Sequence, residues 1–269
     1  ALPILTFFSE PDKQYHRMSG LNMTAHLLIA AFQSVDEFKT RMTTPREDTH
    51  TFEFGRLAHT LLLEPEKFDA KIGGPVNPRT GKTFGRDSQK FRAWADEQPG
   101  TVVTPEEHAL ATRMAASVRR HKAASKLLAV GEPEQVARAR YADMPCQIRC
   151  DWIARCWIVD YKTTSDVYGF AAAIEQYGYL IQGAFYQAVA EIVTGRRLPY
   201  YIIATEKSDE APTVVFQLNE KDVAEQRRRN EAKLREIRSD FLRINETRAD
   251  VSLLEQRAEE VFSLATEIV

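Results

Sequence analysis

The pattern of apolar and polar positions divides the chain into three parts. From 22 to about 128, the apolar residues recur at helical spacing. Within this part, Thr104 and Glu107 form a capping box, and Pro105 occupies the first helical position. A long connection at 73–86 interrupts the helices, and loops of this length in compact domains are usually functional or mobile. The first part is therefore predicted to be mainly helical.

The pattern changes between 134 and 163, where three short runs predict a β-meander. Their sequences are EQVARARYA, PCQIRCDWI and CWIVDYK, with turn signals at 143–145 and 154–155. The remaining segments follow in this order: helical periodicity at 168–194, apolar runs at 200–205 and 213–218, a long charged helix from about 220 to 246, and one more helix at 250–268.

Composition narrows the class of protein. The 269 residues, 43% of them hydrophobic, suffice for one large globular domain or two small ones. No apolar stretch approaches the roughly 18–20 residues of a membrane span, and no signal-peptide pattern opens the chain, so we expect a cytoplasmic protein without membrane contact. The net charge of −2 argues against coating of nucleic acid by bulk electrostatics, although a local basic groove remains compatible with it. Three cysteines, Cys146, Cys150 and Cys156, favour buried thiols over a disulfide framework.

The stretch CDWIARCWIVDYKTT at 150–164 places three charges among apolar residues. Side chains alternate along a strand, so Asp160 and Lys162 share one face, and a tight turn would bring Asp151 close to Asp160. Two adjacent carboxylates repel each other unless a divalent cation binds between them. Lys162 could then orient or deprotonate the attacking water, or stabilise developing negative charge. The alternative is a buried Asp160–Lys162 salt bridge, with Asp151 capping the turn.

Three further side chains are candidates for the same chemistry. His59 lies in the helical segment FGRLAHTLLL, where the alternative is a core histidine with satisfied hydrogen bonds. Gln182 and Tyr186 are spaced i and i+4 in YLIQGAFYQAV and therefore share one face of a helix. Their alternative is ordinary half-buried packing.

These pieces occur in an ordered series along the chain. The series is Gly55-x-x-x-His59-x-x-x-Leu63-Glu64-Pro65-Glu66, then Asp151, then Asp160-Tyr-Lys162-Thr-Thr, then Gln182-x-x-x-Tyr186. From about 52 to 205, it resembles the RecE exonucleases (exodeoxyribonuclease VIII) of phage and prophage recombination systems. These belong to the RecB-like branch of the PD-(D/E)xK nuclease superfamily. The chain departs from the pattern at Cys150, where relatives tend to carry Pro, and at Asp160, where the superfamily frequently has Glu; neither departure removes a ligand.

The resemblance implies an α/β (α+β) fold, with a PD-(D/E)xK core in which helices flank a mixed central β-sheet. We expect one nuclease domain over 1–269, with a mainly helical part at 1–128 that carries His59, a catalytic sheet core at 134–218, and C-terminal helices at 219–269. The implied activity is Mg²⁺-dependent, ATP-independent, 5′-to-3′ digestion of linear double-stranded DNA, which leaves 3′ single-stranded tails for recombination by strand annealing. A PD-(D/E)xK endonuclease and a non-catalytic DNA-binding module are the alternatives.

The resemblance also implies roles for individual residues. His59, Asp151 and Asp160 would bind Mg²⁺ together with the backbone carbonyl of Tyr161, and Glu134 is a possible further ligand. Two metal ions are expected, and Mn²⁺ is expected to substitute. Lys162 would contact the nucleophilic water, while Gln182 and Tyr186 would support the lysine or the scissile phosphate.

The resemblance and the long loop indicate which molecules the protein is expected to bind. Members of the family bind double-stranded DNA ends, assemble as ring-shaped homotetramers and work with a RecT-type single-strand annealing protein. The loop residues Arg79, Lys82 and Arg86 are our candidates for contacts with DNA phosphates near the site.

Overall fold

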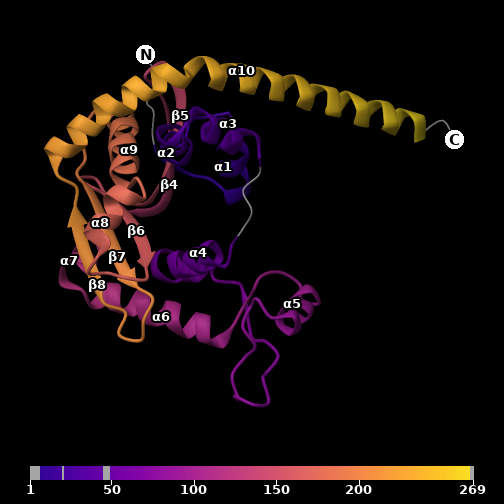
Figure 1. Cartoon of the computed structure of the whole chain (residues 1–269), viewed down its shortest axis with the longest axis vertical. Helices are drawn as coiled ribbons and strands as arrows, with labels where there is room; N and C mark the ends of the chain where they lie inside the picture. The colour runs from indigo at the N-terminus through magenta and orange to yellow at the C-terminus, as the bar shows by residue number, and fades with distance from the viewer. Residues whose placement is uncertain (1–6, 20, 45–48, 267–269) are drawn as a thin grey trace.

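The computed structural model describes residues 7–19, 21–44 and 49–266. Its centre is a six-stranded mixed sheet in the order β1-β4-β5-β6-β7-β8 (Figure 1). The strands are β1 (Phe8–Ser9), β4 (Glu132–Tyr141), β5 (Met144–Ile153), β6 (Ile158–Thr164), β7 (Tyr200–Glu206) and β8 (Thr213–Gln217). Neighbouring strands are antiparallel except β6 and β7, which are parallel. The predicted meander and mixed sheet are confirmed.

Helices cover both faces of this sheet, as predicted. They are α1 (Asp12–Ser19), α2 (Ala25–Gln33), α3 (Val35–Thr43), α4 (His50–Leu63), the 3-10 helix η1 (Pro65–Lys67), α5 (Gln89–Asp96), α6 (Pro105–Arg120), α7 (Lys122–Leu127), α8 (Phe170–Gln176), α9 (Tyr179–Thr194) and α10 (Glu220–Thr266). Helix α6 begins with the predicted capping box, in which Thr104 and Glu107 exchange backbone and side-chain hydrogen bonds. Two short strands, β2 (Lys71–Ile72) and β3 (Val102–Val103), form a separate parallel pair.

Alternate residues of the central strands enter two different hydrophobic cores. On β6, Ile158 packs in the core that contains α2, α9 and α10, whereas Val159 and Tyr161 pack in the core that contains α4 and α6. A sheet that is buried on both faces needs apolar residues at consecutive positions, which explains the nearly continuous apolar run here. Asp160 and Lys162 therefore lie together on the α9 side, as the strand period predicted.

The meander closes through two short turns. Ala142 and Asp143 both have positive φ, 49° and 60°, which matches the two-residue turn that suits the twist of a hairpin. The turn between β5 and β6 carries Cys156, which is exposed, so the prediction of a buried thiol is wrong for this residue because it falls in the turn and not in a strand. The other two cysteines, Cys146 and Cys150, are buried as predicted.

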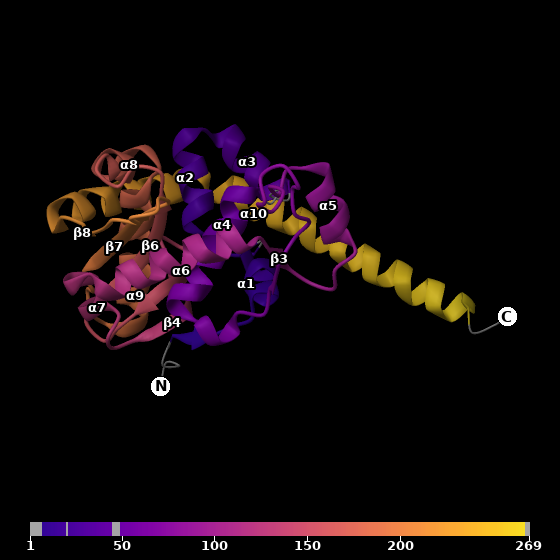
Figure 2. The same cartoon turned by 90° about the horizontal axis from the view of Figure 1, so that it is seen from below.

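Helix α10 differs from the prediction of two separate C-terminal helices. It is continuous from Glu220 to Thr266, because no Gly or Pro interrupts this stretch. Its first part packs on α9, α2 and α3, and the rest continues beyond the body of the molecule (Figures 1 and 2). Within the described ranges, none of the helices, α10 included, is both long enough and apolar enough to cross a membrane.

Candidate active site

The candidate site forms where β5 and β6 separate. The paired residues of these two strands end with Trp152 opposite Val159. Beyond that point, the carboxylate Oδ2 of Asp151 accepts the backbone N–H of Tyr161 at 2.7 Å. A buried N–H group without an acceptor costs free energy, so Asp151 takes the place of the missing strand partner. This hydrogen bond holds the Asp151 carboxylate in the gap between the strands.

Asp160 is the most deeply buried carboxylate of the site, with 2% of its surface exposed. Its Oδ1 accepts a hydrogen bond from Gln182 Nε2 at 2.8 Å. Its Oδ2 lies 2.6 Å from Lys162 Nζ but makes no hydrogen bond of good geometry among the described residues. Burial raises the pKa of the Asp160 carboxyl; Lys162 opposes this rise and Asp151 adds to it, so that the pKa stays above its ordinary value.

Lys162 lies between this carboxylate and an aromatic ring. Its ammonium is 5.0 Å from the ring centroid of Tyr179. Burial alone would lower the pKa of Lys162, but the carboxylates of Asp160 and Asp151 outweigh burial and raise it. The lysine is therefore an ammonium at neutral pH, suited to stabilise negative charge and to orient a water molecule, not to remove a proton from it.

The Asp160–Lys162 salt bridge, which was the structural alternative to a catalytic site, is present. Asp151, however, does not cap the turn as that alternative required. Its carboxylate faces Tyr161 and His59, not the turn between β5 and β6. The Nδ1 atom of His59, on α4, lies 3.7 Å from Asp151 Oδ2. The His59 ring also packs at a tilt against Tyr161, with 5.1 Å between the ring centroids. His59 is thus at the rim of the site and is only partly buried.

Glu134 reaches the same place from β4. Its φ is 50°, a left-handed conformation that is uncommon for a residue with a side chain and that is found disproportionately at functional sites. His59, Glu134 and Asp151 each offer one ligand atom, and these three atoms lie within 4.8 Å of one another. Glu134, expected as a possible further ligand, lies in this group.

This set of donors fits a divalent metal ion, which PD-(D/E)xK nucleases typically use. Carboxylate oxygens suit hard cations such as Mg²⁺ and Mn²⁺, and an imidazole nitrogen is a common ligand of first-row transition metal ions. The buried Asp160 Oδ2, which has no hydrogen-bond partner among the described residues, is a further carboxylate oxygen, and Asp160 lies close enough to Asp151 for the Asp151 charge to raise its pKa. His59, Glu134 and Asp151 could therefore hold a cation, with Asp160 and the Tyr161 carbonyl as the other predicted ligands.

The two predicted residues of α9 have different surroundings. Gln182 is buried and holds Asp160, as described above. Tyr186 is also buried, and its ring meets Tyr200 edge-on with 6.0 Å between centroids. Its predicted support of Lys162 or of a phosphate stays a prediction. Burial raises the pKa of Tyr186 well above its ordinary value, so its hydroxyl is a hydrogen-bond donor and not an anion.

Two further side chains at the site, Tyr179 and Arg149, were not predicted, although each has a signal in the sequence. Tyr179 precedes Gln182 and Tyr186 by three and seven residues, which is one stripe of a helix. Arg149 precedes Asp151 by two residues and so points to the same side of β5.

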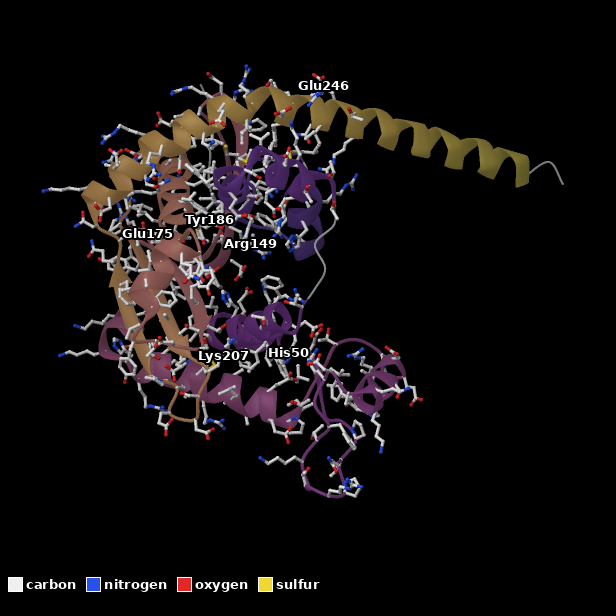
Figure 3. The ribbon with its side chains drawn as sticks, viewed as in Figure 1. His50, Arg149, Glu175, Tyr186, Lys207 and Glu246 are labelled. Carbon is white, nitrogen blue, oxygen red and sulfur yellow. The ribbon has the colours of Figure 1, made fainter. Side chains whose placement is uncertain are left out.

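Arg149 links the acidic cluster to the N-terminal helix α1. Its Nε lies 3.0 Å from a Glu134 carboxylate oxygen. Its guanidinium also lies over the Tyr15 ring, 4.6 Å from the centroid. Figure 3 shows Arg149 and Tyr186 toward the middle of the molecule. Because a nearby arginine offsets the charge of Glu134, it reduces the repulsion among the grouped acids.

The long loop at 73–86 folds into a projecting finger (Figure 1). Val76 bridges Thr83, and the backbone N–H of Asn77 donates to the Lys82 carbonyl at 2.8 Å. Arg79 and Lys82 are exposed at its tip. The finger therefore presents two cations to solvent.

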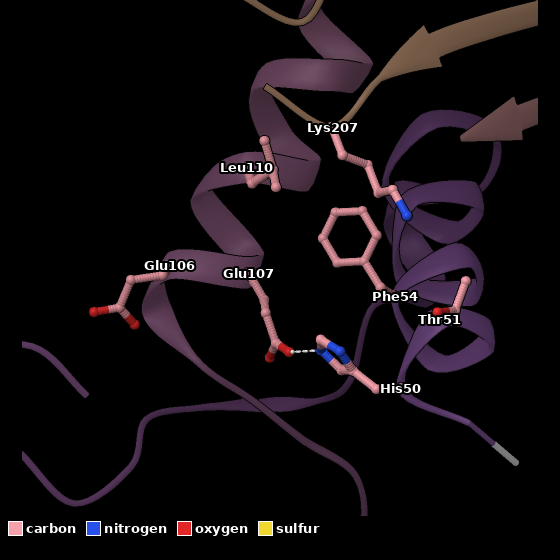
Figure 4. Close-up of a pocket in the computed structure, with 7 residues that line it drawn as sticks. All are labelled: His50, Thr51, Phe54, Glu106, Glu107, Leu110 and Lys207. Carbon is pink, nitrogen blue, oxygen red and sulfur yellow. Dashed lines mark hydrogen bonds and ion pairs between the residues drawn. The ribbon is translucent and has the colours of Figure 1, made fainter. Parts of the chain in front are cut away.

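The third loop cation, Arg86, lies at the base of the finger and is enclosed. It forms ion pairs with Glu53 and Glu107 and donates to the Val102 carbonyl. The same Glu107 pairs with His50, with 2.7 Å between His50 Nε2 and the carboxylate (Figure 4). Arg86 thus joins the finger to α4 and α6.

The comparisons with known proteins agree with this fold. The architecture and the grouped acids with Lys162 define a PD-(D/E)xK-type nuclease fold. The chain belongs to the family described as "PDDEXK-like domain of unknown function (DUF3799)", whose model matches residues 23–246. The predicted superfamily is therefore confirmed. No curated protein matches the chain.

A solved structure shares the fold. It is the crystal structure of a protein from Eubacterium rectale described as "Putative exonuclease", with a TM-score of 0.65 and 15% sequence identity. The match covers 89% of this chain and 88% of that one. At this identity, the likeness shows a shared fold over nearly the whole of both chains.

Proposed function

We propose that this protein is an exonuclease of the RecE type, which uses Mg²⁺ or Mn²⁺ and no ATP to digest linear double-stranded DNA from 5′ to 3′. The observation that carries the proposal is the meeting of Asp151, Asp160 and Lys162 where β5 and β6 separate, with His59 beside them. The direction of digestion and the 3′ single-stranded tail rest on the resemblance of the sequence to RecE exonucleases.

The side chains of the site have distinct tasks in this reaction. His59, Glu134, Asp151 and Asp160 would hold the metal, together with the Tyr161 carbonyl. When bound, a divalent metal supplies Lewis acidity toward the phosphate and lowers the pKa of a coordinated water. The Lys162 ammonium donates hydrogen bonds and stabilises the negative charge that develops on the phosphate.

Two hydrogen bonds keep the carboxylates in place for this work. Gln182 holds Asp160 Oδ1, so the rotation of that carboxylate is restricted and its Oδ2 faces Lys162. The backbone N–H of Tyr161 holds Asp151 in the same way. Fixed charges of this kind need little reorganisation when charge develops in the reaction.

We extend the proposal to the partners that the resemblance implies. The enzyme acts on DNA ends, with Arg79 and Lys82 of the finger contacting phosphates. It assembles as a homotetrameric ring and hands the 3′ tail to a RecT-type annealing protein. In a ring, basic groups line the channel while the outer surface stays acidic, which is compatible with a net charge of −2.

The decisive experiment uses two DNA substrates. Linear duplex DNA and a covalently closed circle are incubated with the protein and Mg²⁺ or Mn²⁺, without ATP, and a third reaction contains EDTA. We expect nucleotides to be released from the linear DNA alone, first from a label at the 5′ end, and only with metal. Cleavage of the closed circle would instead identify an endonuclease. Binding to DNA without cleavage of either substrate would identify a non-catalytic module.

A further inference from the structure

A row of aromatic rings leads from the site to the surface. The Lys162 ammonium lies 5.0 Å from the ring of Tyr179, and this ring lies 6.0 Å from the ring of Tyr177. Tyr179 also stacks on buried Phe170, with 5.7 Å between centroids and 20° between the ring planes. Phe170 thus fixes the ring that connects Lys162 with Tyr177.

Tyr177 lies at the break between α8 and α9, next to Gly178. The periodicity predicts helical structure throughout 168–194, yet α8 ends at Gln176 and α9 begins at Tyr179. Gly178 has φ = 72°, a left-handed conformation that favours glycine. A Cβ atom at this position would also lie 3.0 to 3.2 Å from the Ile29 side chain. The break is therefore built into the fold.

Tyr177 takes no part in either hydrophobic core among the described residues, and 57% of its surface is exposed. A single exposed tyrosine is ordinary on a protein surface. The informative feature is its place at the end of a ring series that starts at Lys162. Successive nucleotides of a strand rise about 3.4 Å, so two contacts of 5.0 and 6.0 Å span only a few nucleotides.

We propose that Tyr177 is a stacking platform for an unpaired nucleobase of the strand whose phosphate lies at Lys162. The inference rests on the proposed DNA-cleaving function and adds how the substrate is held. Every nucleobase offers a flat π-face, so an exposed tyrosine ring binds bases with little sequence preference. Such a platform suits an enzyme that must cut any sequence.

The platform also gives a physical reason for a requirement for DNA ends. Inside a duplex, both faces of each base are covered by its neighbours, and exposing one costs a few kcal/mol of unstacking and unpairing. A terminal base is covered on one side only and frays readily. Tyr177 therefore favours DNA whose end has opened by one or a few base pairs.

The test measures stacking directly, without cleavage. A duplex with 2-aminopurine in a frayed 5′ end is titrated with protein in EDTA, and both fluorescence and Kd are recorded. We expect wild type and Tyr177→Phe to quench the probe equally. We expect Tyr177→Leu, which keeps apolar bulk but lacks the ring, to lose the quenching and to bind about 5-fold or more weakly, since base–aromatic stacking contributes ~1–3 kcal/mol per base. Quenching and affinity that are unchanged in Tyr177→Leu would overturn the proposal.

Tyr168 provides a matched control, because it is another tyrosine on the surface, 85% exposed, just before α8. Tyr168→Leu should bind and quench as wild type does, whereas a loss equal to that of Tyr177→Leu would overturn the specific role of Tyr177. Cleavage of linear DNA by wild type is scored separately. If wild type cleaves linear DNA and Tyr177→Leu still quenches, the stacking inference fails and the proposed function stands. If wild type neither binds nor cleaves DNA, both fail.

Discussion

The Asp151 carboxylate accepts the backbone N–H of Tyr161 at 2.7 Å, just beyond the last paired residues of β5 and β6. The same oxygen lies 3.7 Å from His59 Nδ1. The Asp151 carboxylate thus serves both the backbone of the sheet and the candidate metal cluster. The backbone N–H of Tyr161 needs only a hydrogen-bond acceptor, whereas a bound cation needs the negative charge of the carboxylate.

Substitution of Asp151 should therefore separate stability from activity. Asp151→Asn keeps a carbonyl oxygen that can accept the Tyr161 N–H, so its free energy of unfolding should stay near that of wild type. Asp151→Ala leaves this N–H without an acceptor and should cost about 1–3 kcal/mol. Both variants should lose metal-dependent cleavage of linear DNA. Urea unfolding and a nuclease assay measure the two effects, and equal unfolding free energies for the two variants would contradict the structural role.

The finger should respond differently at its tip and at its base. Replacing both Arg79 and Lys82 by Ala should weaken DNA binding and flatten its dependence on salt, because each lost phosphate contact lowers the slope by about 0.9. The melting temperature should not change, since both side chains are exposed. Titrations at several salt concentrations give the slope, and a slope equal to that of wild type would mean that the tip does not contact DNA.

Arg86→Ala is the matching change at the base. It leaves Glu53 and Glu107 without their shared cation, and we expect it to lower the free energy of unfolding by about 1–3 kcal/mol. If Arg86→Ala kept full stability and instead flattened the salt dependence, Arg86 would be a phosphate contact after all.

Glu107 should make stability depend on pH. Burial by itself would raise the pKa of this carboxyl, but the Thr104 N–H, His50 and Arg86 outweigh burial and hold the pKa below the ordinary 4.5. A lowered pKa means that the group stabilises the fold above 4.5 and that this contribution is lost as the pH falls through the folded-state pKa. Glu107→Gln should thus unfold more easily than wild type at neutral pH, with a difference that shrinks in acid. Denaturant unfolding across this range measures it, with exposed Glu106→Gln as the control.

The strand pattern and local signals predicted the sheet and the shared face of Asp160 and Lys162. The alternation of Val159, Asp160, Tyr161 and Lys162 places two of them in one core and two toward α9, as the period of a strand requires. The capping box at Thr104 was equally readable, because it depends on residues three apart.

What the sequence did not reveal depends on contacts between distant segments. Arg86 looked like a free loop cation, but Glu53 and Glu107, which lie 33 and 21 residues away in the chain, enclose it. The break between α8 and α9 interrupts an otherwise helical pattern. Gly178 is its local signal, since glycine is common at helix ends, but the close approach to Ile29 at this position is not readable from the local sequence. The roles of His59, Tyr186 and the DNA contacts stay predictions.

The Asp160–Lys162 pair provides the sharpest test of the site. The pKa of Asp160 is raised, chiefly by burial, so its stabilising contribution is fully present below the unfolded-state value of 3.8 and is lost as the pH rises through the folded-state pKa. Ionisation of this carboxyl therefore works against the metal-free fold. Asp160→Asn removes the charge and keeps an acceptor for Gln182, and Lys162 retains Asp151 and the Tyr179 ring as neighbours.

We expect this variant to lose cleavage, to keep DNA-end binding, and to be as stable as wild type or more so in EDTA, with a gain that grows with pH. A purely structural salt bridge predicts the reverse, a loss of about 3–5 kcal/mol with cleavage retained. Thermal unfolding in EDTA beside a nuclease assay in Mg²⁺ distinguishes the two.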